Sequence, residues 1–142
     1  MLRRLLPLAM MALVACSSGE RDADDVATDL EGVVTPATVE RLLRDVDLTR
    51  TALTIHVGSD APERFGPDGQ RALEDYLRDA AQRMAGAAVE ITQRSVEERA
   101  GGVAITLTLR VRQGAEERYV PVALEVVRAG RRWVVTRARV MR

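Results

Sequence analysis

Residues 88–141 constrain the fold most, because apolar and polar side chains alternate there over four consecutive segments. The segments are 88–96, 103–112, 119–127 and 132–141. In 103–112 every second residue is apolar, which is the period of a β-strand with one buried face. Short turns that contain glycine separate the later segments, and turns of this length connect antiparallel strands. The pattern predicts a four-strand antiparallel meander.

Two amphipathic helices are expected before these strands. The first begins at Thr35-Pro36, where a threonine cap precedes a proline at the first helical position, and covers 36–46. Arg41 and Asp45 stand four residues apart on it as an expected surface ion pair. The second helix ends before Gly86 and has one apolar stripe, formed by Leu73, Tyr76, Leu77, Ala80, Ala81 and Met84.

The segment between the two helices is less clear. Residues 48–57 fit either a continued helix or a strand, but the β-branched residues favour a strand over 51–57. Residues 58–69 hold three glycines, two prolines and two aspartates, and this composition predicts a loop.

Helix, strand, helix and a four-strand meander together predict an α+β fold, with helices packed on a curved, four- to five-stranded antiparallel sheet. Over 35–142 this order resembles the nuclear transport factor 2-like, or cystatin-like, superfamily. Two motifs agree with the resemblance: Phe65-Gly66-Pro67-Asp68-Gly69 before the second helix, and Gly130-Arg131-Arg132-Trp133-Val134-Val135 in the last strand. The resemblance implies a cone-shaped pocket between helices and sheet. One clear N-terminal helix in place of the usual pair predicts that this pocket is shallow or closed.

The N-terminus has the pattern of an export signal. Arg3 and Arg4 precede eleven apolar residues, which are too few to span a bilayer. The run ends in Leu13-Val14-Ala15-Cys16, which resembles the lipobox of bacterial lipoproteins and contains the only cysteine of the chain. The resemblance implies that residues 1–15 are a signal peptide, and that Cys16 is acylated and becomes the mature N-terminus. The protein is then expected in the cell envelope, lipid-anchored in the outer membrane or on the outer face of the plasma membrane.

Residues 16–34 are expected to be the acylated cysteine and a flexible tether, and 35–142 a single domain. Residues 17–34 hold six acidic side chains and one arginine. Low hydrophobicity with charge of one sign favours a solvated, extended segment.

Composition and motifs exclude several classes of site. The formal charge is zero and aromatic residues make up 3%, which argues against a nucleic-acid partner. One cysteine and one histidine are too few for a protein zinc site, and no metal or other cofactor is expected. The sequence has no phosphate-binding glycine loop and no paired catalytic carboxylate motif, so no catalytic residue is assigned.

Two sets of residues are candidates for binding. His56 and Tyr76 are the titratable side chains expected near the cone-shaped pocket. Residues 103–142 carry nine arginines and three glutamates, and the strand period places some of these arginines on one face of the sheet. That face suits an anionic envelope component or an acidic protein. Its expected residues are Arg110, Arg112, Arg137 and Arg139.

Two functions follow from these observations. The first is a membrane-anchored envelope lipoprotein that acts as a non-catalytic binding or interaction module. The alternative is a small-molecule enzyme, similar to an isomerase or dehydratase, that uses a cone-shaped pocket. A cavity lined by two or more titratable side chains would favour the enzyme.

Overall fold

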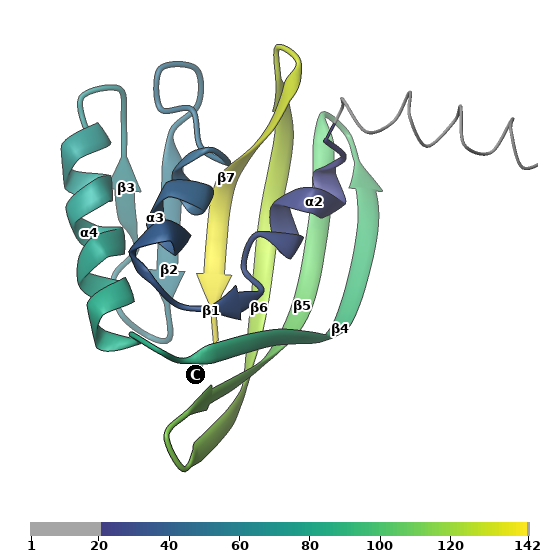
Figure 1. Cartoon of the computed structure of the whole chain (residues 1–142). Coiled ribbons are helices and arrows are strands. Elements are labelled where there is room, and N and C mark those ends of the chain that lie inside the picture. The colour runs from purple at the N-terminus through teal and green to yellow at the C-terminus, as the bar shows by residue number, and fades with distance from the viewer. Residues whose placement is uncertain (1–20, 142) are drawn as a thin grey trace, which may run out of the picture.

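The computed structural model describes residues 21–141. One seven-stranded sheet, in the order β1-β4-β5-β6-β7-β2-β3, carries all three described helices on the same face (Figure 1). The helices are α2 (Ala23–Thr28), α3 (Pro36–Leu43) and α4 (Gln70–Arg83). The strands are β1 (Gly32–Val33), β2 (Leu53–Val57), β3 (Glu63–Phe65), β4 (Ala88–Arg99), β5 (Gly102–Gln113), β6 (Glu116–Ala129) and β7 (Arg132–Val140).

The predicted meander is confirmed as β4 to β7, and each of these strands pairs antiparallel with the next. Along β5, Ile105, Leu107, Leu109 and Val111 are all buried, so the predicted alternation does select the core face. The helix predicted at 36–46 is α3, and its last regular residue is Leu43.

The sheet differs from the expected one in size and direction. It has seven strands rather than four or five, and it is mixed, because β2 runs parallel to β7. β3 lies inside the predicted loop 58–69 and pairs with β2, where Phe65 is buried. A three-residue strand is too short for its period to be recognised in the sequence.

The predicted tether is wrong over residues 23–33, which fold against the domain as α2 and β1. The buried side chains of α2 are Ala23, Val26 and Ala27, and β1 pairs with the start of β4. The spacing of positions 23, 26, 27 and 30 is that of an amphipathic helix. The acidic residues between them obscured this pattern, although they lie on the solvent side or pair with arginines such as Arg94.

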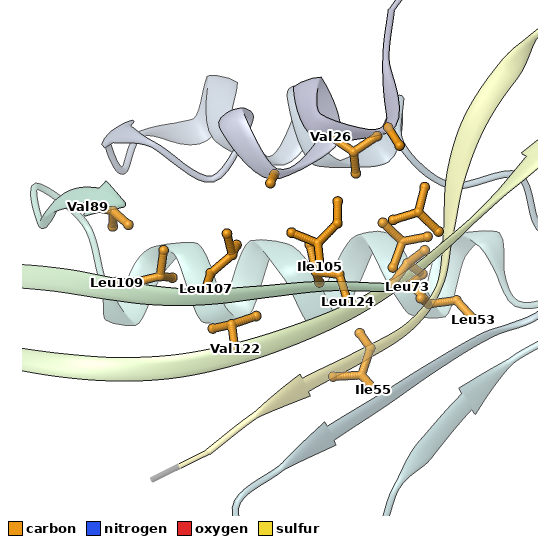
Figure 2. Packing of buried hydrophobic residues seen from close by; sticks show 14 of the residues in the cluster. Val26, Leu53, Ile55, Leu73, Val89, Ile105, Leu107, Leu109, Val122 and Leu124 are labelled. Atoms are coloured by element: carbon orange, nitrogen blue, oxygen red, sulfur yellow. The ribbon is translucent and has the colours of Figure 1, made fainter. Parts of the chain in front are cut away.

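The core fills the space between the helices and the sheet. Figure 2 labels side chains from α2, α4, β2, β4, β5 and β6 that converge there. The largest fully buried side chains are Leu73, Ile105, Leu107, Val39, Val126 and Val134.

Docking of α2 can be tested with one buried and one exposed position on the same helix. Ala27 is fully buried and its neighbour Thr28 is exposed. Ala27→Glu is expected to lower the free energy of unfolding by about 2–4 kcal/mol and to open the segment before β1 to proteases, because a buried charge has no partner there. Thr28→Glu should change either quantity little. Equal proteolysis of the two variants would show that α2 does not pack on the sheet.

Candidate functional site

A small cavity lies between α2, α3, α4 and the helix-covered face of the sheet. Its volume is about 100 Å³. Eight of its nine lining residues are aliphatic, and the ninth is Asp45; they are Val26, Leu30, Leu42, Asp45, Val46, Leu53, Leu77, Leu124 and Val135. The position is that of the pocket implied by the family resemblance, and the side chains of α2 make it narrow.

Asp45 follows the last turn of α3, and backbone hydrogen bonds hold it there. Its N–H donates to the Leu42 carbonyl at 3.0 Å, and its own carbonyl accepts from the Val135 N–H at 2.7 Å. The carboxyl is 4% exposed. Its Oδ2 atom is buried and has no hydrogen-bond partner within the described part of the chain. A carboxyl group is therefore held in an almost wholly apolar site.

Arg21, the residue before the cap of α2, joins Asp45 to a second carboxyl group. Its Nη1 donates to Asp45 Oδ1 at 3.0 Å, and its Nη2 forms an ion pair with Asp29. The sequence predicted a surface pair between Arg41 and Asp45, but the partner of Asp45 is Arg21. Arg41 instead donates to the Glu31 carbonyl at 3.3 Å.

Burial and the neighbouring Asp29 raise the pKa of Asp45 to about 8, against the opposing charge of Arg21. Burial acts in the same direction on Asp29, but hydrogen bonding to Asp45 and Arg21 outweighs it, and the pKa of Asp29 is lowered. The charge of Arg44 also lowers the pKa of Asp29. The carboxylate of Asp25 is a further negative charge near Arg21. The raised pKa of Asp45 favours the protonated form of this carboxyl group, and Arg21 balances the charge of Asp29.

Sequence reasoning missed Arg21 and Asp45. Both were assigned to solvated segments, Arg21 to the tether and Asp45 to the outer face of a helix. Leu42 and Val46, on either side of Asp45, are apolar. They were the signal that this end of α3 faces the core.

His56 and Tyr76 do not come together. Tyr76 lies on α4, where its ring meets Phe65 edge-on with 5.8 Å between the centroids. His56 alternates with the buried Ile55 on β2, so it lies on the opposite face of the sheet, beside Arg139 of β7. Neither residue lines the cavity. Their role in binding stays a prediction.

The four arginines of the predicted basic face share the face of the sheet away from the described helices, as two pairs that lie at least four residues apart along β6. The register places Arg110 and Arg112 beside β6 on that face, and Arg137 and Arg139 continue it on β7. Arg110 pairs with Glu90, Arg112 with Glu117 at 3.6 Å, and Arg137 with Glu125 at 3.8 Å. Glutamates thus balance three of the four charges, and binding of an anionic partner to this face is untested.

No group of three or more His, Cys, Asp or Glu side chains within residues 21–141 could hold a metal ion. None of the helices in this range is long and apolar enough to cross a membrane. Cys16, the predicted lipidation site, lies outside the described residues.

Comparison of the fold with known structures identifies its type. A putative ketosteroid isomerase from Shewanella frigidimarina is similar over 83% of this chain and 93% of its own, with a TM-score of 0.64 and 11% identity. An NTF2-like protein of unknown function from Shewanella oneidensis matches over 84% of this chain and 98% of its own (TM-score 0.58, 13% identity). A protein with a cystatin-like fold from Nostoc punctiforme matches over 82% and 85% (TM-score 0.58, 10% identity).

These likenesses show that the chain has the NTF2-like, or cystatin-like, fold. The sequence matches no known protein family and no curated protein. At 10–13% identity the solved structures carry information about the fold alone.

Proposed function

We propose that this chain, built on an NTF2-like fold, is a lipid-anchored envelope protein whose domain acts as a non-catalytic binding or interaction module. The observation that carries the proposal is the interior cavity. Its volume of about 100 Å³ is well below the ~300–1,000 Å³ of typical ligand pockets. One titratable side chain lines it, and a hydrogen bond to Arg21 already occupies that group.

The anchoring part of the proposal is supported by the sequence at the N-terminus. Leu13-Val14-Ala15-Cys16 combines a lipobox-like pattern with the only cysteine of the chain. Acyl chains on Cys16 would hold the protein firmly, since two or more chains bind a bilayer far more strongly than one.

Acylation predicts a complete loss of lipid labelling on removal of the thiol. Cys16→Ser is expected to abolish incorporation of labelled fatty acid, because the thiol is the group that carries the acyl chain. A Ser17→Ala variant, which alters the next residue and keeps the thiol, should remain labelled and membrane-bound. Labelled, membrane-bound Cys16→Ser protein would refute the lipoprotein assignment.

An isomerase- or dehydratase-like enzyme is the second candidate, and Asp45 is the observation that favours it. A carboxyl group that is protonated at neutral pH in an apolar site can donate a proton or a hydrogen bond to a carbonyl group. The fold is also that of the putative ketosteroid isomerase described above.

The two functions differ in whether a small molecule enters the cavity. Methyl resonances of Leu42, Leu77 and Leu124, which line it, can be followed by NMR while a ring ketone such as cyclohexanone is added. A non-catalytic module should show no saturable shifts. Saturable shifts that disappear in Asp45→Asn would support the enzyme.

A further inference from the structure

Five exposed arginines lie at one end of the molecule, on or beside two loops. One loop joins α3 to β2 and carries Arg44 and Arg50. The other is the β6–β7 turn, which carries Arg131 between Arg128 at the end of β6 and Arg132 at the start of β7. Figure 1 shows both at the end of the molecule where α2 begins. We name this surface the arginine end; its residues are Arg44, Arg50, Arg128, Arg131 and Arg132.

Contacts between the two loops hold the arginine end together. Arg132 donates across to the Arg44 carbonyl and, at 3.4 Å, to the Val46 carbonyl. The Arg50 guanidinium lies against Gly130, where φ is +66°. The two loops are therefore joined by contacts of arginine side chains from each loop with the backbone of the other.

The arginine end is less neutralised than the basic face of the sheet. Arg50 is 3.7 Å from Asp47. Asp47 is the only exposed or half-buried carboxylate in residues 44–50 and 128–132, because Asp45 is buried. Within these two segments five positive charges thus stand against one negative charge, and Asp29, at the end of α2, is a further carboxylate near Arg44. On the sheet face, by contrast, glutamates pair with Arg110, Arg112 and Arg137.

The start of the described chain places this end close to the proposed anchor. Arg21 is tied to Asp45, the residue that follows Arg44, and it stands five residues after Cys16. Five residues span at most about 18 Å, even when fully extended. A lipid anchor on Cys16 would therefore hold the arginine end within reach of the headgroups.

Carboxylates near the N-terminal end of the described chain, on the side away from the arginine end, favour one orientation of the domain on a membrane. Asp22 caps α2, Asp24 and Asp25 lie in its first turn, and Glu97 and Glu98 lie on β4 near the β4–β5 turn. Two of these carboxylates are paired, Asp24 with Arg94 and Glu97 with Arg99. An anionic surface would repel these carboxylates and attract the two arginine-bearing loops, so the domain would tilt toward α3–β2 and β6–β7.

From these observations we propose that the arginine end is a membrane-facing surface that binds the anionic phospholipid headgroups of the leaflet holding the anchor. The proposal rests on the anchoring proposed above for its biological setting. Its chemistry is electrostatic: guanidinium groups contact phosphates, and binding weakens as salt screens the charges.

The test uses the chain from residue 17 onward, which retains every described element and carries no lipid. Its binding to vesicles of phosphatidylcholine with phosphatidylglycerol is compared with binding to phosphatidylcholine alone, at low and at physiological salt. The test variant is Arg44→Gln/Arg50→Gln/Arg131→Gln. The matched control, Arg112→Gln/Arg137→Gln/Arg139→Gln, removes the same charge from the sheet face.

The test variant is expected to lose about a hundredfold in partition onto anionic vesicles at low salt, since one near-surface arginine contributes about a fivefold factor. The control should lose less than about threefold, because the distant face does not contact the headgroups. Equal losses, or equal binding to neutral vesicles, would overturn the proposal. Binding to an acidic wall polymer but not to anionic vesicles would also overturn it.

Two features keep the outcomes distinct. Arg50 packs on Gly130, so thermal midpoints are measured first; if the triple variant is unfolded, Arg44→Gln/Arg131→Gln replaces it, with an expected loss of about 25-fold. The vesicle assay contains no lipid anchor, so its result does not depend on Cys16. If Cys16→Ser protein is still labelled with fatty acid, the proposed lipid anchor is refuted. The vesicle experiment would still show whether the arginine end binds anionic headgroups.

Discussion

Asp45→Asn is expected to raise the free energy of unfolding by on the order of 5 kcal/mol at about pH 8.5, and by only about 1–2 kcal/mol near pH 5. Asp45 binds its proton with a pKa of about 8 in the folded chain, against an ordinary value of 3.8. Between these two values the folded chain holds one more proton than the unfolded chain. The free energy of unfolding therefore falls as pH rises through this window, and Asn, which does not titrate, abolishes the fall.

Urea unfolding of the wild type and the variant at both pH values measures this difference. Asp29 does not disturb the comparison, because its lowered pKa affects stability only below about pH 4. Asp47→Asn is the control: this carboxyl lies in the same loop, its pKa is lowered by its hydrogen bond to Thr49, and its replacement should give no gain at pH 8.5. A destabilised Asp45→Asn protein at every pH would show that Asp45 is charged and favourably paired with Arg21.

Leu73→Asp is expected to unfold the domain. The Leu73 side chain is fully buried between α4 and the sheet, so the change removes core packing and places a carboxyl group there without a partner. The expected cost exceeds about 4 kcal/mol, which is comparable with the entire stability of a small domain.

The matched control is Ala72→Asp, the same new side chain at the preceding, exposed position of α4. It should change the free energy of unfolding by less than about 1 kcal/mol. Circular dichroism and urea unfolding distinguish the two variants. A folded Leu73→Asp protein with the stability of Ala72→Asp would mean that α4 presents a different face to the sheet.

The pH effect also bears on function. A structural Asp45 that lowers stability at neutral pH has a cost that a purely aliphatic cavity would avoid. In a binding module this cost is offset by docking of α2, since Asp45 holds Arg21 next to the sheet. In an enzyme the same cost would accompany proton transfer, and the ring-ketone titration separates these two roles.

Much of the fold was predictable because its elements have local signals. The strand β5 and the helix α4 each repeat one period over at least twelve residues, and their buried faces follow from that period alone. Short elements have no such repeat. α2, β1 and β3 span six residues or fewer, and contacts with longer neighbours decide their conformation.

The candidate site was predictable only in its position. The order of helices and strands indicated a cavity between helices and sheet. The expected single N-terminal helix predicted a shallow or closed cavity, but the structure has two helices there, α2 and α3, and Val26 of α2 lines the cavity. The residues chosen for that cavity, His56 and Tyr76, do not line it. A half-buried strand places neighbouring residues on opposite faces, and the alternation of Leu53 and Ile55 with Thr54 and His56 already placed His56 on the polar side of β2.

By itself the sequence determined the α+β class, the meander of β4 to β7, the amphipathic face of α4 and the grouping of Arg110, Arg112, Arg137 and Arg139 on one sheet face. Hydrophobic burial selects one face of a repeating pattern within a single segment, so these features can be predicted from each segment by itself. The tertiary structure alone decided that β2 adds parallel to β7, that α2 covers the core, and that Asp45 pairs with Arg21 rather than Arg41. Each of these features depends on contacts between segments that are at least 20 residues apart in the sequence. The Asp45–Arg21 pair also depends on the burial of a charged group by those contacts.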